Sequence, residues 1–480
     1  MSGVGEPSAA VARRWRRGRI GAAATTLLLG AALSACMPGG AEIPAAQLDV
    51  PPAYTAQAGP PNAAPPAPDW WRGFRSKELS ALIDDAQAVN LDIAVATAQI
   101  IQAEAQARIA GAPLFPSVTG NASAEESARP GGTGQSLFST GLTASYILDF
   151  WGKNRATLHA AIETAVASRE NRAVVELSTI VAVATTYFQV VASQDRLRIA
   201  NDNVATAQRV LDVVNSQFKA GTTSQLEVSQ QESVVATLRA DIPPLELTLR
   251  QDMATLAVLV ARPPEGFKVR GGSIAELAIP RVTPGLPAEL LNRRPDVRQA
   301  EAELASSSYS VKAARAAFFP SIDLTGQGGA ESAALKTLFA PGAWFYSLAA
   351  NLTQPIFDGF LLKGQLQQAR GAQIQALQAY RKAVLSAFSD VEKALIAVDE
   401  TGRQVQLQTD VVKSLRSAFD IAETQLRAGT VNLTTVLQTE QSLFTAEDNL
   451  IQDQLARLDA VLSLFQALGG GWPNGSHAKA

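Results

Sequence analysis

The 480-residue chain has one cysteine, Cys36, and two histidines, His159 and His477. A single cysteine excludes an intramolecular disulfide bond. Two histidines that lie far apart in the sequence cannot supply the ligand cluster of a typical zinc site. No glycine-rich phosphate loop follows an expected strand, and the carboxylates lie mostly on expected helix faces, where solvation explains them. The composition therefore disfavours an enzyme, and we expect no catalytic or metal-binding residues.

Long apolar runs are also absent. No window holds eighteen uninterrupted apolar residues, so we expect no membrane-spanning helix. The apolar run from Ile20 to Ala32 is shorter, and five arginines precede it. This is the shape of a secretory signal peptide, which we predict over residues 1–35. Without it the chain has 36 basic and 43 acidic residues, which disfavours nucleic acid as a partner.

The end of this signal, Leu33-Ser34-Ala35-Cys36, matches the bacterial lipobox. We therefore predict that Cys36 is the first residue of the mature chain and carries a diacylglycerol and an N-acyl (palmitate) group. The alternative is an ordinary signal with an incidental cysteine. Met37 rather than aspartate follows, which favours sorting to the outer membrane. One lipid anchor binds a membrane only marginally, so we expect further membrane contact.

The chain also contains an internal repeat. Asn90-Leu-Asp-Ile and Phe115-Pro-Ser-Val recur, as Arg294-Pro-Asp-Val and Phe319-Pro-Ser-Ile, at an offset of 204 residues. A repeat of about two hundred residues is too long for a solenoid unit, so it indicates a duplicated half-domain. The predicted segments are a lipidated, Pro-rich arm (36–68), a first repeat (69–261), a linker (262–285), a second repeat (286–468) and a C-terminal tail (469–480).

Each copy of the repeat has two short segments of alternating polarity. The four segments are residues 117–125, 135–150, 321–331 and 344–352. Their length and alternation suit the strands of a transmembrane barrel, with apolar side chains toward lipid and polar ones toward a wet lumen. The same pattern fits a half-buried sheet of a soluble protein. Four strands cannot close a barrel alone, so a membrane barrel would require oligomerisation.

The remaining sequence is predicted to be helical. Residues 152–220 have no proline or glycine between their ends, which predicts a helix of roughly 100 Å. Apolar residues recur every seven positions from Val190 to Phe218 and from Val384 to Leu426, a coiled-coil pattern. Gly221 and Gly429 end these stretches, because glycine permits the left-handed conformation past a helix end. Return helices over 225–261 and 433–468 complete one helical hairpin in each copy.

This order of features resembles one known family, the outer-membrane efflux factors of the TolC type. The similarity is to the NodT-like (OprM-like) lipoproteins of tripartite RND efflux pumps, and it spans residues 36 to about 470. Its most specific part is the Arg-Arg-Pro-Asp-Val run. The matching segments are Asp69–Phe74, Asn90–Ile93, Leu114–Val118, Leu286–Val297 and Phe319–Ser321.

The resemblance implies an α+β membrane protein that acts as a homotrimer. Three chains would form a twelve-stranded barrel in the outer membrane, continued by a coiled-coil α-helical barrel through the periplasm. Such a duct needs no cofactor and conducts drugs or other small molecules, which a periplasmic adaptor (membrane fusion protein) and an inner-membrane RND transporter deliver. This activity underlies antibiotic resistance. The alternatives are a type I protein-secretion duct, which usually lacks a lipobox, and a non-conducting structural lipoprotein, which has no use for the strands.

In this family the periplasmic hairpin tips narrow the duct. Matched by position, the tip turns are Gly221 and Gly429, and the constriction-lining residues are Leu226, Glu227, Thr434, Thr435 and Gln438. Three copies of Glu227 would raise the local density of cations, although Glu227 also fits a solvated helix position.

The sequence departs from the family at other positions near the tips. Family members often have aspartates where Thr435 and Gln438 stand, and some have a gating tyrosine and arginine where Leu426 and Val431 stand. Neutral side chains at these four places cannot form salt bridges. We therefore hypothesise that closure here relies more on packing and neutral hydrogen bonds.

Overall fold

The computed structural model describes residues 43–46, 48–55, 66–128, 130, 134–282 and 285–471. The predicted signal peptide, Cys36, part of the predicted arm and the tail beyond residue 471 lie outside these described residues. The chain forms two compact units, and each takes segments from both copies of the repeat. Unit 1 contains the strands, within 106–162 and 305–374. Unit 2 contains most of the helical residues, 45–105, 163–304 and from 375 on.

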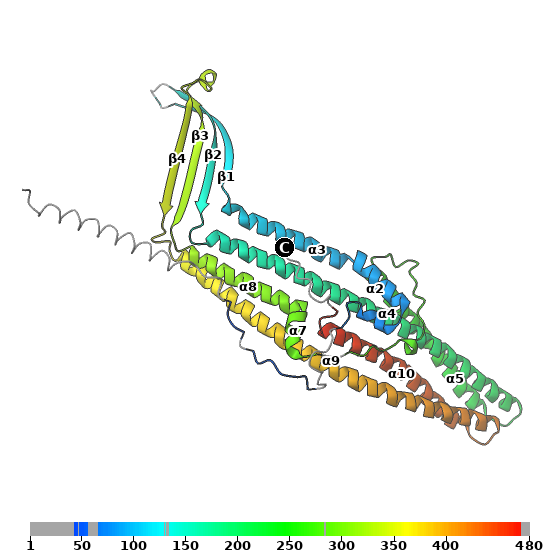
Figure 1. Ribbon diagram of the computed structural model, residues 1–480. Coiled ribbons are helices and arrows are strands. Elements are labelled where there is room, and N and C mark those ends of the chain that lie inside the picture. Colours follow the sequence, from blue (N-terminus) through cyan, green and yellow to red (C-terminus); the bar gives the residue numbers. More distant parts are fainter. Residues whose placement is uncertain are drawn as a thin grey trace, which may run out of the picture. The chain divides into compact units, whose positions relative to one another are not determined.

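Unit 1 is built on one antiparallel sheet (Figure 1). Its strands follow the chain order: β1 (Ser117–Ser127), β2 (Gln135–Leu148), β3 (Ser321–Ser332) and β4 (Trp344–Thr353). All four were predicted, and their ends differ from the prediction by two residues at most. Strands β1 and β2 form one hairpin and β3 and β4 the other. In addition β2 pairs with β3, so the hairpins of the two copies share one sheet.

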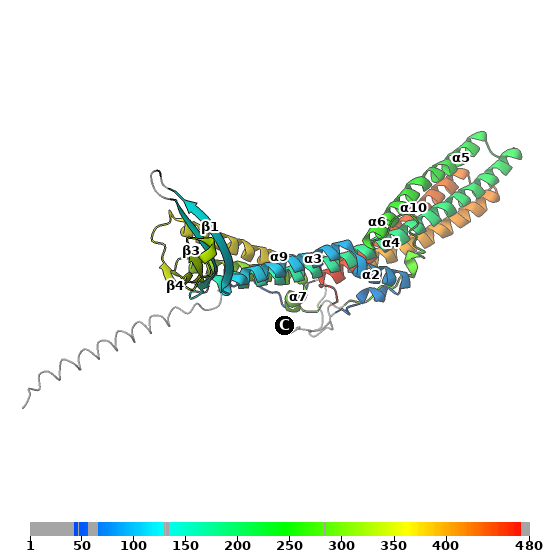
Figure 2. The ribbon, with the colours of Figure 1, turned by 90° about the horizontal axis from the view of Figure 1, so that it is seen from above.

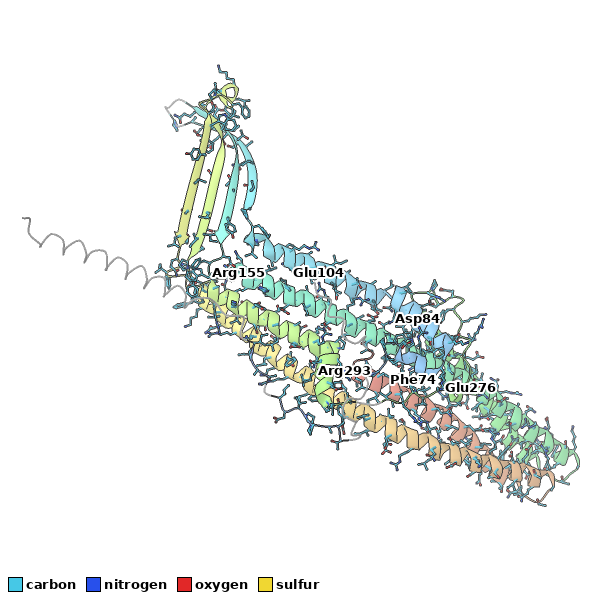
Figure 3. The ribbon with its side chains drawn as sticks, in the orientation of Figure 1. Phe74, Asp84, Glu104, Arg155, Glu276 and Arg293 are labelled. Carbon is cyan, nitrogen blue, oxygen red and sulfur yellow. The ribbon has the colours of Figure 1, made fainter. Side chains whose placement is uncertain are left out.

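The sheet continues into helix α4 (Lys153–Lys219) through a short junction held by Asp149. The carboxylate of Asp149 accepts the backbone N–H groups of Asn154 and Arg155 at 2.9 Å, and Arg155 Nε at 3.1 Å. Figure 3 labels Arg155 at this junction. A carboxylate at a helix N-terminus also interacts favourably with the helix dipole. Beside this junction Trp151 stacks on Phe319 of the second copy, with ring centroids 4.7 Å apart. The junction of the first copy is therefore in direct contact with the segment that leads into β3 of the second copy.

Unit 2 is made of helices, several of which extend into unit 1. Helices α4 and α9 (Leu361–Arg427) have 67 residues each, as expected for the two long helices. They form hairpins with α5 (Gln225–Ala240) and α10 (Leu433–Ala467), respectively (Figures 1 and 2). The other helices are α2 (Lys77–Val89), α3 (Leu91–Gly111), α6 (Ile242–Leu259), α7 (Pro287–Arg293) and α8 (Pro295–Ala316). Short 3₁₀ turns are η1 (Trp70–Phe74), η2 (Ala112–Leu114), η3 (Ile274–Glu276) and η4 (Leu335–Thr337).

The predicted return helix of the first copy is wrong in one respect, because it is not continuous. Helix α5 ends at Ala240, and α6 begins at Ile242 with Pro243 and Pro244 in its first turn. Proline has no N–H to donate and is tolerated only at the start of a helix, so the pair forces a new N-terminus. The second copy lacks these prolines, and α10 runs unbroken for 35 residues.

The predicted seven-residue seam differs between the two copies at its tip end. Val384 and Leu426, at its ends in α9, are buried. In α4 Val190 and Leu211 are buried, but Phe218 is 41% exposed, whereas Leu426 at the same position of the second copy is 4% exposed. The seam of the first copy therefore ends before the hairpin tip.

Helix α4 alone, among the described residues, is long and apolar enough to cross a membrane by length and composition. This differs from the expectation of no such helix, which rested on uninterrupted apolar runs. Half of its most apolar window is buried inside the chain. Ile180, Val183 and Phe188 of this helix belong to the main core, so packing accounts for its hydropathy.

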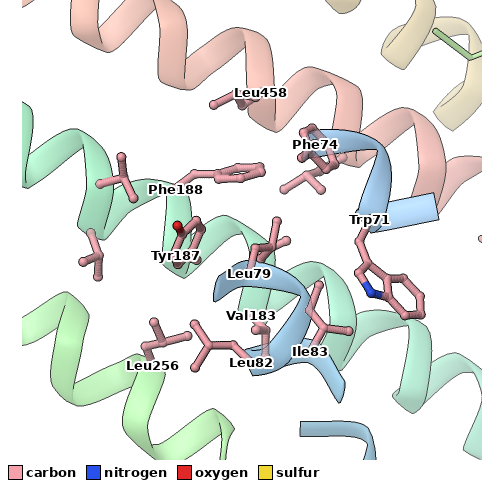
Figure 4. Close-up of a cluster of buried hydrophobic side chains, with 14 of the residues drawn as sticks. Trp71, Phe74, Leu79, Leu82, Ile83, Val183, Tyr187, Phe188, Leu256 and Leu458 are labelled. Atoms are coloured by element: carbon pink, nitrogen blue, oxygen red, sulfur yellow. The ribbon is translucent and has the colours of Figure 1, made fainter. Parts of the chain in front are cut away.

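The main core of unit 2 surrounds the Asp-Trp-Trp-Arg-Gly-Phe segment (Figure 4). Phe74 is completely buried and lies edge-on to Phe188 of α4, with ring centroids 5.1 Å apart. Trp70 stacks on Phe465 of α10 at 4.4 Å. Gly73 leaves room for the linker, because a Cβ there would lie 2.9 Å from Pro280. This segment therefore joins the first helical hairpin, the second hairpin and the linker.

One contact of unit 2 occurs in both copies with different side chains. Asn90, just before α3, donates from Nδ2 to the carbonyl of Leu259 at the end of α6, at 2.8 Å. Arg294, just before α8, donates from Nη1 to the carbonyl of Ala467 at the end of α10, at 3.2 Å. A helix end leaves carbonyl groups without intrahelical partners, and in each copy the start of another helix supplies the donor.

Arg294 makes further bonds that Asn90 cannot make. Its guanidinium pairs with Asp296 at 2.7 Å and with Asp390 of α9 at 3.1 Å. The Arg294 side chain is only 11% exposed, and a charge at such a site is stable only when it is paired and hydrogen-bonded. Arg294 thus ties the start of α8 to the end of α10 and to the middle of α9.

Candidate functional site

The predicted tip turns lie at the same end of the helical bundle (Figures 1 and 2). Gly221 and Gly429 have φ angles of 71° and 70°. The next residue in each turn, Thr222 or Thr430, donates its N–H to the carbonyl five residues back, at 3.0 and 2.9 Å. This is the Schellman arrangement, which needs a left-handed residue at the helix end. No atom lies within 4 Å of a Cβ built on either glycine, so the φ angle alone requires glycine.

Each return helix begins with its own cap. Ser224 precedes α5, and Glu227 completes a capping box: its carboxylate accepts the N–H of Ser224 at 2.8 Å. Asn432 precedes α10, and its side chain accepts the N–H of Thr435 at 3.1 Å. Glu227 and Thr435 therefore occupy the same position of the two copies. The Ser-x-x-Glu spacing was present in the sequence but was not interpreted as a cap.

The capping bonds keep Glu227 charged. Hydrogen bonds from the Ser224 N–H and the Thr223 hydroxyl hold the pKa of the Glu227 carboxyl below its usual value. A negative charge in the first turn also interacts favourably with the helix dipole. Glu227 thus has a structural role as a cap, and its ionised carboxylate remains at the hairpin tip.

The other predicted lining residues lie on the outside of the tips. Leu226 is 67% exposed, and Thr434, its counterpart in α10, is exposed as well. Gln438 is exposed, and Thr435 is partly exposed. The opposite faces of α5 and α10 are buried through Val228 and Val436. The predicted residues therefore lie at the tips on faces that the fold of one chain leaves uncovered.

The contacts between the two hairpins near the tips are mostly neutral. Gln217 of α4 donates from Nε2 to the carbonyl of Leu426 at 2.8 Å. Leu426 and Val431 pack in the apolar cluster of the tip region.

One salt bridge between the hairpins lies farther from the tips. Arg196 of α4 contacts both carboxylate oxygens of Asp448 of α10, at 2.6 and 3.1 Å. The side chains of Arg196 and Asp448 are 31% and 37% exposed, so water partly screens the attraction between their charges. Sequence reasoning missed it, because residues 252 positions apart carry no local signal.

Two buried polar residues were also missed. Gln231 of α5 and Glu440 of α10 are 0% and 1% exposed. Each stands three or four residues from buried apolar residues of its own helix, so each occupies a core position. They were missed because the sequence pattern of the buried helix faces was read from apolar residues alone.

Among the described residues no three metal-ligand side chains gather into a candidate metal site.

Replacing Glu227 by alanine should fray the first turn of α5. The loss of a capping side chain costs about 1 kcal/mol locally. Amide hydrogen exchange of the N–H groups of residues 224–228 should therefore speed up about fivefold. Glu232→Ala, an exposed position of the same helix, is the control. Equal exchange rates in the two variants would show that the capping box does not stabilise the first turn of α5.

Comparison with known proteins identifies the family. The chain matches the outer membrane efflux protein family twice, over residues 82–262 and 286–470. It is 39% identical over 417 residues to the pyoverdine export outer membrane protein OpmQ of Pseudomonas aeruginosa, covering 84% of this chain and 87% of OpmQ. It is 31% identical over 427 residues to the solvent efflux pump outer membrane protein SrpC of Pseudomonas putida, covering 88% and 91%.

Solved structures show the same architecture. The outer-membrane channel OprN superposes with a TM-score of 0.84 at 25% identity, over 90% of this chain and 99% of that one. These proteins are channels, not enzymes. The sheet, the paired long helices and the two tip turns are thus those of a known class of molecule, and this chain belongs to the outer membrane efflux protein family and is an efflux channel of the outer membrane.

Proposed function

We propose that three copies of this chain form a twelve-stranded barrel in the outer membrane and a helical tunnel in the periplasm. The observation that carries this proposal is the sheet with open edges. Strands β1 and β4 each pair on one side only, and every residue of both is exposed. Open edges are not tolerated in a membrane, and eight strands is about the smallest closed barrel. Other copies of the same sheet can close it.

A second observation supports the same assembly. Ile374, Leu385, Ile396 and Leu407 recur every eleven residues along α9 and are 61%, 55%, 49% and 62% exposed. An eleven-residue apolar repeat keeps one stripe of a nearly straight helix facing a partner. On α3 Leu91, Val95 and Ile101 are 66%, 57% and 65% exposed. In the proposed trimer other copies cover these stripes.

Replacing Leu385 and Leu407 together by aspartate should therefore abolish trimers. Two charges would replace apolar surface that the assembly buries, at a cost of about 2 kcal/mol or more per site in each of three interfaces. Light scattering of detergent-purified protein should report the mass of one chain. The matched variant with methionine at both positions should remain a trimer, and a trimeric aspartate variant would show that these residues are not at the interface.

We further propose that Leu226, Glu227, Thr434, Thr435 and Gln438 line the narrowest part of this duct. The support is their position at the tips and their exposure in a single chain. Replacing Thr435 and Gln438 by alanine removes two neutral polar groups and should raise the closed-state conductance in single-channel recordings. Unchanged conductance would count against neutral closure at these positions.

The proposed cargo is small molecules that an inner-membrane RND transporter and a periplasmic adaptor deliver. The support is the pair of relatives named for pyoverdine export and for solvent efflux. Deleting the gene should make cells retain such compounds, and normal export in the deletion strain would contradict this.

We also propose lipidation of Cys36. Mass spectrometry of the mature N-terminal peptide tests it, since an unmodified cysteine would exclude the anchor.

A further inference from the structure

Three buried oxygen atoms without partners lie on α5 and α10, whose flanking apolar residues pack in one cluster, and the Gln231 side chain is near enough to act on Glu440. They are both carboxylate oxygens of Glu440 and Oε1 of Gln231. The amide nitrogen of Gln231 is already used, since Nε2 donates to the carbonyl of Ala207 of α4 at 3.0 Å. An ionised carboxylate has no hydrogen to donate, so it could not bond to the amide oxygen. Buried acceptors without donors are costly.

We propose that Glu440 binds a proton and donates it in a hydrogen bond to Gln231 Oε1, joining α10 to α5. One proton satisfies two of the three unpartnered oxygens. This hydrogen bond would join α10 of the second hairpin to α5 of the first. Because Gln231 also bonds to Ala207 of α4, it would connect three helices. Gln231 lies ten residues beyond Gly221 and Glu440 eleven beyond Gly429, so the contact is roughly 15 Å from the tip turns.

The surroundings favour the neutral acid. Apolar residues of the tip cluster enclose the contact: Val228 and Val235 on α5, Val436 and Leu443 on α10, and Phe419 on α9. Burial raises the pKa of Glu440 to about 7, and the charge of Glu423 on α9 raises it further. A hydrogen bond donated by the Gln231 side chain would lower this pKa, but Nε2 of Gln231 already donates to the carbonyl of Ala207.

The charged side chains of the neighbouring helices do not neutralise Glu440. Glu423 has its own partner, Arg427, at 2.6 Å. Glu447, seven residues along α10, is paired with Arg416 of α9. The charged residues of the facing stretches of α4 and α5 are exposed: Asp202, Arg209, Asp212, Glu232 and Arg239. Among the described residues, then, no cation reaches the Glu440 carboxylate, and a proton is the species that neutralises it.

The duplication supplies an internal comparison. At the offset of 208 Glu440 corresponds to Glu232, which is exposed on α5. Val228 and Val235 correspond to Val436 and Leu443, and all four are buried. The two helices thus share their apolar positions, but only the second places its glutamate in the core.

The sign of the pH dependence follows from the raised pKa. Glu440 binds its proton more tightly when the two hairpins are packed together than when they are separated, because separation would expose its carboxyl group to water. The stabilisation is therefore complete at low pH and is lost as the pH rises through about 7. If the tips open as proposed above, opening becomes easier with rising pH. That consequence rests on the proposed function, whereas the proton site itself does not.

Infrared spectroscopy of the purified full-length protein tests the proton site. The wild type should show a protonated glutamic acid carbonyl band that disappears with a midpoint of about pH 7 and is missing in Glu440→Gln. Labelling the glutamates with carbon-13 separates this band from that of Asp459, whose pKa burial raises to about 6. A wild type with no such band one pH unit below that midpoint would overturn the proposal, even if the variant failed to fold.

Hydrogen exchange tests the coupling to packing. After correction for intrinsic exchange, opening of residues 225–240 and 433–447 should rise roughly tenfold per pH unit up to about pH 7 and level off above it. Glu440→Gln, which keeps a donor for Gln231, should remove this slope, and Glu232→Gln should retain it. The same slope in Glu440→Gln would contradict the coupling. Neither measurement requires a conducting channel, so its failure is distinguishable from failure of the proposed trimeric duct.

Discussion

Replacing Gly329 by alanine should separate β2 from β3 and so divide the sheet into its two hairpins. A Cβ at this position would lie 2.2 Å from the carbonyl oxygen of Thr140 and 2.7 Å from Cα of Gly141. Both neighbours are backbone atoms of the paired strand, so no side chain can move to make room. We expect a loss of about 3 kcal/mol or more and a collapse in the fraction of protein that migrates as folded oligomer in dodecyl sulfate gels.

The adjacent glycine is the matched control for this prediction. A Cβ on Gly328 would meet its nearest atom, the carbonyl oxygen of Phe345, at 4.0 Å, which is ordinary contact. Gly328→Ala should therefore migrate like the wild type. If Gly329→Ala also forms normal oligomers, then β2 and β3 do not approach as closely as described, and the joint sheet of the two copies would be wrong.

Replacing Arg294 by methionine should destabilise the helical unit by about 3 kcal/mol. The variant keeps the length of the side chain but loses the bonds to Asp296 and Asp390 and to the carbonyl of Ala467. The urea concentration at half unfolding, followed by far-ultraviolet circular dichroism, should fall accordingly. Hydrogen exchange should locate the largest loss of protection at the C-terminal end of α10.

Asn90→Ala is the corresponding change in the first copy. Asn90 caps α3 through bonds to the N–H groups of Asp92 and Ile93, at 2.9 and 3.2 Å, and reaches the end of α6. The loss of these bonds should lower the free energy of unfolding by about 2 kcal/mol. Amide hydrogen exchange should become faster at the C-terminal end of α6 and at the N-terminal end of α3. If both variants unfold at the wild-type urea concentration, these contacts do not stabilise the helical unit.

The sequence was sufficient to predict the elements of this fold, because their signals are local. Alternating polarity predicted all four strands. The absence of proline and glycine predicted α4, and the seven-residue apolar repeat predicted α9. Two consecutive prolines, Pro243 and Pro244, were the signal for the break between α5 and α6 and were overlooked. The pairing of β2 with β3 could not be predicted, since it joins residues almost two hundred positions apart and no turn specifies it.

The chemistry of the tips was less predictable from sequence. Repeat alignment places Glu227 opposite Thr435, but whether a first-turn glutamate caps its own helix or faces a lumen depends on its rotamer. Asn90 and Arg294 share a position, yet their common target is a carbonyl 169 or 173 residues away. Glu440 was overlooked for a different reason. Glutamate normally lies on a solvated helix face, and only the packed bundle reveals that this one is enclosed.

We propose that three chains form this channel and that it conducts. Light scattering of the detergent-purified mature protein, combined with planar-bilayer recording of the same sample, tests both properties in one preparation. We expect three times the mass of one chain, together with discrete conductance steps after insertion. A particle with the mass of a single chain that never conducts would contradict it.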